Sequence, residues 1–229
     1  MLNALQRLRN GVVVLCYAEG DDPFNQPESM ASFARSAEIG GADGIRAQEP
    51  ENIKAIRAAV SLPVIGISKG SYSDGWVLVT PDFSDVEQVV EAGADIVALD
   101  VTARTRPNGL DGFQFLEQVR KRFDTILMAD VSTYEEGLRA ADCGADAIAT
   151  TLSGYTPATE GTVDNFPDFN LLERLTPEVH VPVVAEGRIW TPSEAAHAIK
   201  CGAYAVVVGS AVTRPQIITR RFVETVKNL

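Results

Sequence analysis

The chain has few of the residues that build disulfide frameworks and metal centres. Its 229 residues include three cysteines at unrelated spacings and two histidines, His180 and His197, that stand apart. An odd, unpatterned set of cysteines excludes a disulfide-stapled scaffold and is typical of small buried apolar residues in a reducing compartment. Because neither histidine has a second histidine nearby, the sequence predicts no metal site.

Long apolar runs and an excess of positive charge are also lacking. No stretch is apolar over the roughly 20 residues that a transmembrane helix needs, and the first residues lack the basic and apolar regions of a secretory signal. We therefore expect a cytoplasmic protein with no membrane partner. The formal net charge of −11 argues against nucleic acid, whose phosphates the average surface would repel. It does not exclude a small anion.

An internal repeat is the main positive signal. Segments that begin Gly-Ala and continue into an apolar run recur roughly every fifty residues, starting at Gly41, Gly93, Gly144 and Gly202. In each segment the glycine can take the left-handed conformation that closes a helix, and the apolar run is typical of a buried parallel strand. A repeat of this length holds two strand–helix units.

Further apolar runs between the repeats bring the number of predicted strands to eight. They lie at 12–15, 64–67, 126–129 and 183–185, and helical patterns occupy 27–39, 52–59, 84–91, 112–122, 134–143, 192–201 and 215–226. This alternation predicts a parallel sheet of the α/β class, and eight strands favour closure over an open doubly wound sheet. The length is usual for one such fold, so we expect a single (β/α)8 TIM barrel over residues 1–229.

Five predicted strands end in residues capable of acid–base or ionic chemistry. These residues are Arg46, Lys69, Asp100, Asp130 and Glu186. The carboxyl ends of barrel strands converge on one mouth, where side chains distant in sequence meet around a small ligand. The pattern therefore predicts an enzyme with its site at that mouth.

Six basic residues directly follow predicted strands, in the loops at the mouth of the barrel: Arg46, Lys69, Arg104, Arg106, Arg188 and Arg214. A locally positive funnel in an acidic protein is expected of an enzyme that handles a phosphorylated metabolite. Alternatively, Arg104 and Arg106 are solvated loop residues.

The last two predicted strands lead into glycine-containing loops. Loops in these positions, with a short helix after them, form the usual phosphate site of the barrel. We expect the backbone N–H groups at Gly187 and Gly209, the Ser210 hydroxyl and the guanidinium of Arg188 or Arg214 to bind phosphate. Alternatively, the two glycines only end their strands.

Five strings carry a resemblance to a known family. They are LPVIGI at 62–67, MADVSTYEEG at 128–137, TTLSGYT at 150–156, AEGRI at 185–189 and VGSAVTRP at 208–215. Over nearly its whole length the chain resembles the N-acetylmannosamine-6-phosphate 2-epimerase family of sialic-acid catabolism. The resemblance implies a TIM barrel that interconverts N-acetylmannosamine 6-phosphate and N-acetylglucosamine 6-phosphate without a cofactor, and it also implies a homodimer.

The resemblance gives roles to single residues. The family's proton-transfer lysine falls on Lys69, its A-E-G glutamate on Glu186, its A-D-[IV]-S-T aspartate on Asp130 and its I-R-A arginine on Arg46. Thr151, in the TTLSGYT string, is expected to contact the substrate.

The implied reaction needs proton transfer at C2, which becomes acidic only when ring opening makes C1 a carbonyl. Glu186 shuttles protons during ring opening or serves the other face of C2; alternatively it only pairs with Arg46 or Arg188. Lys69 acts as a base if burial and cations such as Arg46 keep it neutral, or stays charged and stabilises the enolate. Asp130 orients Lys69 or Arg46.

Two positions depart from the family's pattern. Tyr17 replaces a glutamine in the first-strand motif S-C-Q-A, and Gly70 replaces an arginine in the loop motif I-K-R-[DN]-Y. Tyrosine is bulkier, so it re-sites the sugar or admits a related substrate. Two other functions therefore remain open: a Schiff-base aldolase or lyase that uses Lys69, and a non-catalytic sugar-phosphate-binding homologue. Trp76 and Trp190 cover the sugar or pack on the barrel rim.

Overall fold

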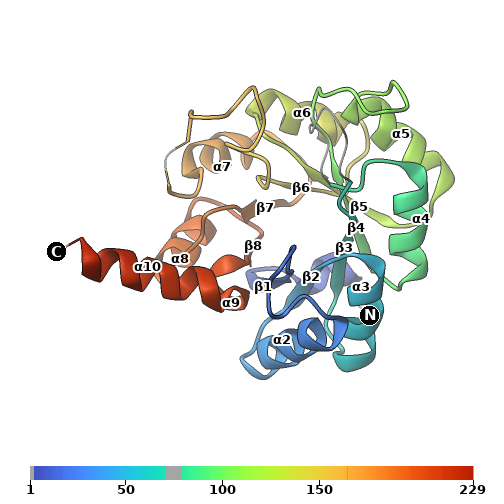
Figure 1. Cartoon of the computed structure of the whole chain (residues 1–229). Coiled ribbons are helices and arrows are strands. Elements are labelled where there is room, and N and C mark those ends of the chain that lie inside the picture. Colours follow the sequence, from blue (N-terminus) through green and yellow to red (C-terminus); the bar gives the residue numbers. More distant parts are fainter. Residues whose placement is uncertain (1–2, 71–78, 164, 229) are drawn as a thin grey trace.

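Eight parallel strands form a closed barrel in the order β1 to β8 (Figure 1). The computed structural model describes residues 3–70, 79–163 and 165–228, so Trp76 and the loop tyrosine at 72 lie outside the described residues. The strands are β1 (Gly11–Cys16), β2 (Gly44–Gln48), β3 (Val64–Ile67), β4 (Ile96–Asp100), β5 (Ile126–Asp130), β6 (Ala147–Ala149), β7 (Val183–Glu186) and β8 (Ala205–Val208). The predicted fold class is confirmed.

Helices surround the barrel (Figure 1). They are α1 (Ala4–Arg7), α2 (Pro27–Ile39), α3 (Pro50–Ala59), α4 (Phe83–Glu91), α5 (Gly112–Arg122), α6 (Tyr134–Asp142), α7 (Phe169–Leu175), α8 (Pro192–Lys200), α9 (Ser210–Thr213) and α10 (Pro215–Lys227). All seven predicted helices are present, with ends that differ by at most a few residues. The sequence did not predict α1 or α7, because helices of one or two turns show no clear apolar period.

The repeat glycines close helices as predicted. Gly41, Gly93, Gly144 and Gly202 have φ angles of 88°, 95°, 94° and 98°, respectively. These angles lie in the left-handed region that residues with a Cβ atom adopt at a cost, which explains why glycine recurs at these four junctions. Each junction then leads directly into β2, β4, β6 or β8.

The apolar core has two shells. Inside the barrel, inward-facing strand residues such as Val13, Ile96 and Met128 pack with Leu5 and Leu8 of the N-terminal segment. A larger cluster lies between the outer faces of the strands and the helices. Because side chains alternate along a strand, the inner shell fills the barrel interior and leaves polar residues at the carboxyl ends of the strands.

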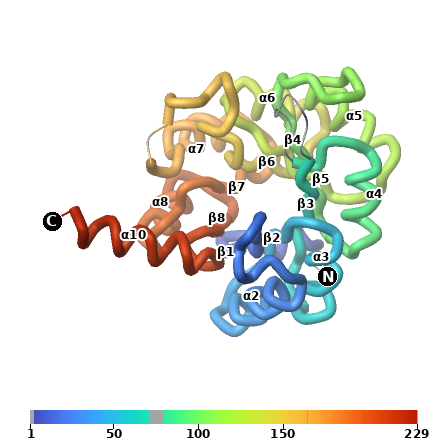
Figure 2. Tube along the Cα trace, in the orientation of Figure 1, coloured from blue at the N-terminus to red at the C-terminus, as the bar shows by residue number. Residues whose placement is uncertain are grey.

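The last helix extends away from the barrel (Figures 1 and 2). None of the residues of α10, all of which the structure describes, is buried. Phe222 and Val226 are 71% and 65% exposed. No helix within residues 3–70, 79–163 and 165–228 has the length and apolar character needed to span a bilayer.

Candidate active site

A buried ion cluster joins three strands inside the barrel. Arg46 lies within β2, since that strand continues to Gln48, and not in a mouth loop as the sequence predicted. Asp130 and Glu186 are the last residues of β5 and β7. The exposed fractions of the three side chains are 1% for Arg46, 0% for Asp130 and 8% for Glu186.

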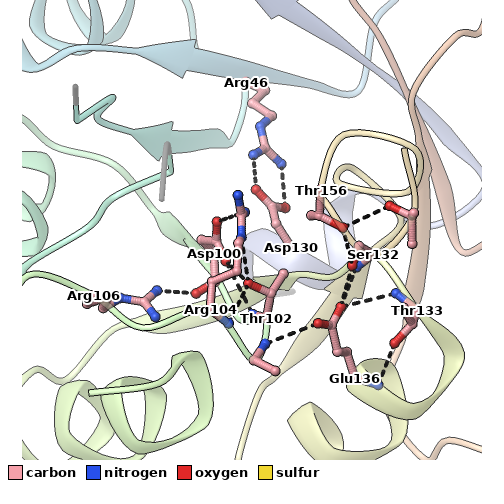
Figure 3. Close-up of polar contacts among 12 residues, drawn as sticks. Arg46, Asp100, Thr102, Arg104, Arg106, Asp130, Ser132, Thr133, Glu136 and Thr156 are labelled. Carbon is pink, nitrogen blue, oxygen red and sulfur yellow. Dashed lines mark hydrogen bonds and ion pairs between the residues drawn. The ribbon is translucent and has the colours of Figure 1, made fainter. Parts of the chain in front are cut away.

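The Arg46 guanidinium lies between the two carboxylates. Its Nη1 donates to Asp130 Oδ1 at 3.1 Å and to Glu186 Oε2 at 2.8 Å, while Nη2 donates to Asp130 Oδ2. Figure 3 shows the paired contacts between Arg46 and Asp130. Asp130 therefore orients Arg46, one of its two predicted partners. The guanidinium occupies the space between the two carboxylates where a metal cation would otherwise bind.

Two threonines of the loop after β6 complete the cluster. The Thr151 hydroxyl donates to Asp130 Oδ1 at 2.9 Å. The Thr150 hydroxyl donates to the Glu186 carbonyl at 3.0 Å and accepts from its N–H at 3.1 Å. Because these contacts fix both the backbone of Glu186 and the carboxylate of Asp130, the site is preorganised.

The environment of Glu186 shifts its pKa toward neutrality. Burial raises the pKa from its ordinary value of 4.5 to about 7; Arg46 opposes the shift and the charge of Asp130 adds to it. Burial alone would lower the pKa of Arg46, but the two carboxylates raise it well above its ordinary value. At neutral pH Glu186 is thus able both to donate and to accept a proton, as a general acid–base catalyst must.

This pKa makes stability depend on pH. A carboxyl group with a raised pKa in the folded state stabilises the fold at low pH, and the contribution is lost as pH rises from about 4.5 toward 7. Glu186→Gln has no such group. We expect the difference in free energy of unfolding, variant minus parent, to be about 2 kcal/mol more positive at pH 8 than at pH 5. Urea denaturation at both pH values measures this; a constant difference would contradict the raised pKa.

The cluster opens into a cavity of about 350 Å³ at the barrel mouth. This is the size of a small-molecule site. Among the predicted site residues, the walls include Tyr17, Arg46, Lys69, Thr151, Glu186, Gly187, Arg188, Gly209 and Ser210. Trp190 also lines the cavity, where it could cover a bound sugar, which is one of the two positions predicted for it.

Lys69 reaches the cavity from the loop after β3. Its ammonium group contacts Glu19 and lies 5.6 Å from the centre of the Tyr17 ring. Its side chain is 35% exposed, so the burial that the sequence analysis considered is not present. Since β3 and β7 lie on opposite sides of the closed barrel, Lys69 and Glu186 approach the cavity from opposing walls.

The predicted phosphate loops also meet at the mouth. Gly187 has a φ of 114°, and Gly209 immediately precedes the short helix α9. The hydroxyls of Tyr17 and Ser210 are 3.0 Å apart. Tyr17, which stands where the family motif has glutamine, is therefore part of this wall.

The positive funnel is smaller than predicted. Arg46, Lys69 and Arg188 line the cavity, but Arg104, Arg106 and Arg214 are not among its walls. Arg104 pairs with the Asp100 carboxylate and Arg106 donates to the Asp100 carbonyl, so both stabilise the end of β4 and neither is a solvated loop residue (Figure 3). Arg214 Nε lies 2.9 Å from Asp22 Oδ2.

Glu19 and Gln48 are among the cavity residues that the sequence did not predict. Gln48 lies two residues after Arg46 in the same strand, so strand alternation places both on the inner face and was a usable signal. Glu19 lies in an irregular loop, where no periodicity predicts the direction of a side chain.

Comparison with known proteins agrees with this geometry. The profile of the family described as "Putative N-acetylmannosamine-6-phosphate epimerase" matches residues 30–228. The chain belongs to this family. The membership predicted from the five sequence strings is thereby confirmed.

Relatives of the epimerase family match almost the whole chain. A Caldanaerobacter subterraneus subsp. tengcongensis protein, named "Putative N-acetylmannosamine-6-phosphate 2-epimerase", is 50% identical over 230 aligned residues, covering 99% of this chain and 95% of the relative. A Clostridioides difficile protein of the same name is 40% identical over 223 residues, covering 97% and 99%. The solved N-acetylmannosamine-6-phosphate 2-epimerase from Clostridium perfringens is 40% identical, with a TM-score of 0.91 and coverage of 96% and 95%.

Proposed function

We propose that this member of the epimerase family interconverts N-acetylmannosamine 6-phosphate and N-acetylglucosamine 6-phosphate in sialic-acid catabolism. The observation that carries the proposal is the buried Glu186, with a pKa of about 7, facing a cavity that Lys69 enters from the opposing wall. Epimerisation removes a proton from one face of C2 and returns one to the other. Two proton-transfer groups on opposing walls fit that requirement.

The reaction proceeds through the open-chain sugar. Glu186 moves a proton between the C1 hydroxyl and the ring oxygen, which breaks the C1–O5 bond and leaves an aldehyde at C1. The Lys69 amine takes the proton from C2 and leaves an enolate, and protonated Glu186 gives a proton to the other face, which yields the epimer. Arg46, held by Asp130, keeps the Glu186 carboxylate in place through the 2.8 Å contact. No cofactor takes part in these steps.

An NMR spectrum of N-acetylmannosamine 6-phosphate incubated with the protein in D2O tests the proposal. We expect signals of N-acetylglucosamine 6-phosphate with deuterium at C2. If the sugar is unchanged but raises the melting temperature of the protein, the chain is a sugar-phosphate-binding homologue without catalytic activity. A covalent adduct on Lys69 after borohydride treatment would indicate the Schiff-base lyase instead.

The phosphate group is proposed to bind where Gly187, Gly209 and Ser210 meet, with Arg188 and Arg214 supplying positive charge. Arg188 already lines the cavity, and its guanidinium donates to the carbonyls of Phe166 and Ser153. Arg214 stacks on Tyr17 at 4.7 Å and would exchange its Asp22 contact for the phosphate.

Arg188→Ala and Arg214→Ala are each expected to raise KM by about tenfold or more, with a smaller change in kcat. The reason is that a charge-assisted hydrogen bond to phosphate contributes to ground-state and transition-state binding alike. Steady-state kinetics measure both constants. Arg220→Ala, which removes an equal charge from the exposed part of α10, is the control and should leave KM unchanged. A fall in kcat with an unchanged KM would contradict a role of these arginines in phosphate binding.

A cytoplasmic location and a homodimer complete the proposal. The three cysteines are free, which fits a reducing compartment. The exposed apolar side chains of α10 fit burial against a second copy of the chain. Sedimentation analysis of the full chain measures the oligomeric state directly.

A further inference from the structure

Three potential metal ligands meet on the outer surface of the barrel. In the described part of the chain, Glu173, His197 and Cys201 form a group whose ligand atoms all lie within 4.8 Å of one another. Glu173 belongs to α7, His197 to α8, and Cys201 is the residue that ends α8. The four-residue spacing of His197 and Cys201 places both side chains on one face of the helix.

The two separations that involve the Cys201 sulfur match a tetrahedral site. Cys201 Sγ lies 3.6 Å from His197 Nε2 and 3.3 Å from Glu173 Oε1. Tetrahedral Zn²⁺ with Zn–S of about 2.3 Å and Zn–N or Zn–O of about 2.0–2.1 Å separates sulfur from nitrogen or oxygen by about 3.5 Å. An ion would therefore fit beside the sulfur, with the histidine nitrogen and the carboxylate oxygen within 4.8 Å of each other.

The surrounding contacts hold the ligands in place. The His197 ring packs edge-on against Phe169 of α7, with ring centres 4.5 Å apart. The Thr176 hydroxyl donates to the Cys201 carbonyl at 3.3 Å, which joins the ends of α7 and α8. A site on packed helices needs less ordering when it binds an ion than a site on a loop.

We propose that Glu173, His197 and Cys201 form a Zn²⁺ site that ties α7 to α8. Thiolate, imidazole and carboxylate are the ligands that Zn²⁺ uses in proteins, and water would complete the tetrahedron. The spacing of the histidines alone predicts no metal site, whereas the cysteine four residues after His197 is a usable signal for one.

The site is separate from the catalytic cavity. Helix α8 starts after β7 and ends just before β8, so Cys201 lies toward the end of the barrel opposite the mouth. None of the three ligands is among the residues that line the cavity. The site is therefore structural, and it does not depend on the function proposed above.

Titration of the chelator-treated full chain with Co²⁺ and with Zn²⁺ tests the site. We expect one Co²⁺ per chain with a thiolate-to-cobalt absorption band, displaced by Zn²⁺, and a rise in melting temperature of about 5 °C at saturating Zn²⁺. Cys201→Ser should abolish the band, and His197→Asn should weaken binding by at least about tenfold. A folded parent protein that binds neither ion, or a Cys201→Ser variant with unchanged Zn²⁺ affinity, would overturn the proposal.

Cys143→Ser is the matched control. Cys143 also ends a helix, α6, and is half-buried like Cys201, but it does not belong to the ligand group. The variant should keep the cobalt band and the Zn²⁺-dependent melting temperature. Loss of both in Cys143→Ser would assign the metal to that cysteine instead.

Discussion

Glu186→Gln and Lys69→Met should each lower kcat by about 10²–10⁴-fold, the range that positioned acid–base groups contribute. Glutamine keeps the shape and hydrogen-bonding capacity of Glu186 but cannot exchange a proton in ring opening. Methionine keeps most of the length of Lys69 without its amino group, so proton transfer at C2 is lost. Both groups act on atoms at C1 and C2, away from the phosphate.

Binding should survive these substitutions. We expect inorganic phosphate and the sugar phosphate to bind with affinities within a few-fold of the parent, because the phosphate loops are unchanged. Turnover and equilibrium binding, measured on the same preparations, separate the two effects. Lys54→Met and Glu178→Gln make the same replacements at exposed positions and serve as controls. Near-normal turnover of both active-site variants would show that the mechanism is wrong.

Arg46→Met should be among the most destabilising single substitutions in the chain. It removes the cation between Asp130 and Glu186 and leaves two buried carboxylates facing each other. Breaking a buried ion cluster in this way lowers the free energy of unfolding by about 3–5 kcal/mol. The loss should be largest at high pH, where both carboxylates are charged, and smaller at pH 5, where protonation relieves the repulsion.

Two further variants show whether burial and charge are the cause. Arg57→Met breaks an Arg–Asp pair of similar chemistry whose side chains are 35% and 29% exposed, and we expect a loss of about 1 kcal/mol or less. Adding Glu186→Gln to Arg46→Met should recover part of the stability, because one of the two repelling charges is removed. Denaturant unfolding of the single and double variants measures both effects; equal losses for Arg46→Met and Arg57→Met would contradict the argument.

Local patterns predicted the barrel because each depends on only a few neighbouring residues. The Gly-Ala repeats gave four strand starts, and the positive φ angles of Gly41, Gly93, Gly144 and Gly202 follow from the same signal. The residues that end β5 and β7, Asp130 and Glu186, were placed at the site because barrel strands share one mouth. These inferences required no knowledge of which side chains touch.

Contacts between elements distant in sequence were predicted only in part. The sequence predicts Arg46 in a loop because the apolar pattern before it ends at Ile45, whereas the pairing of β2 with β3 extends that strand to Gln48. The sequence also treated Arg104, Arg106 and Arg214 as members of one funnel, although each has a nearby acidic residue or carbonyl as its partner. Ion pairing of this kind depends on side-chain directions that sequence spacing does not specify.

The sequence by itself determined the closed eight-stranded barrel and the family, because these follow from short-range periodicity and from motif strings. The acid–base roles of Lys69 and Glu186 are predictions from the motif strings. Only the tertiary structure decided which charges meet. It brought Arg46, Asp130 and Glu186 from three strands into one buried cluster, set Lys69 against Glu19, and placed His197 and Cys201 beside Glu173. The physical reason is that electrostatic effects depend on distance and burial in space, and both are fixed only when the barrel closes.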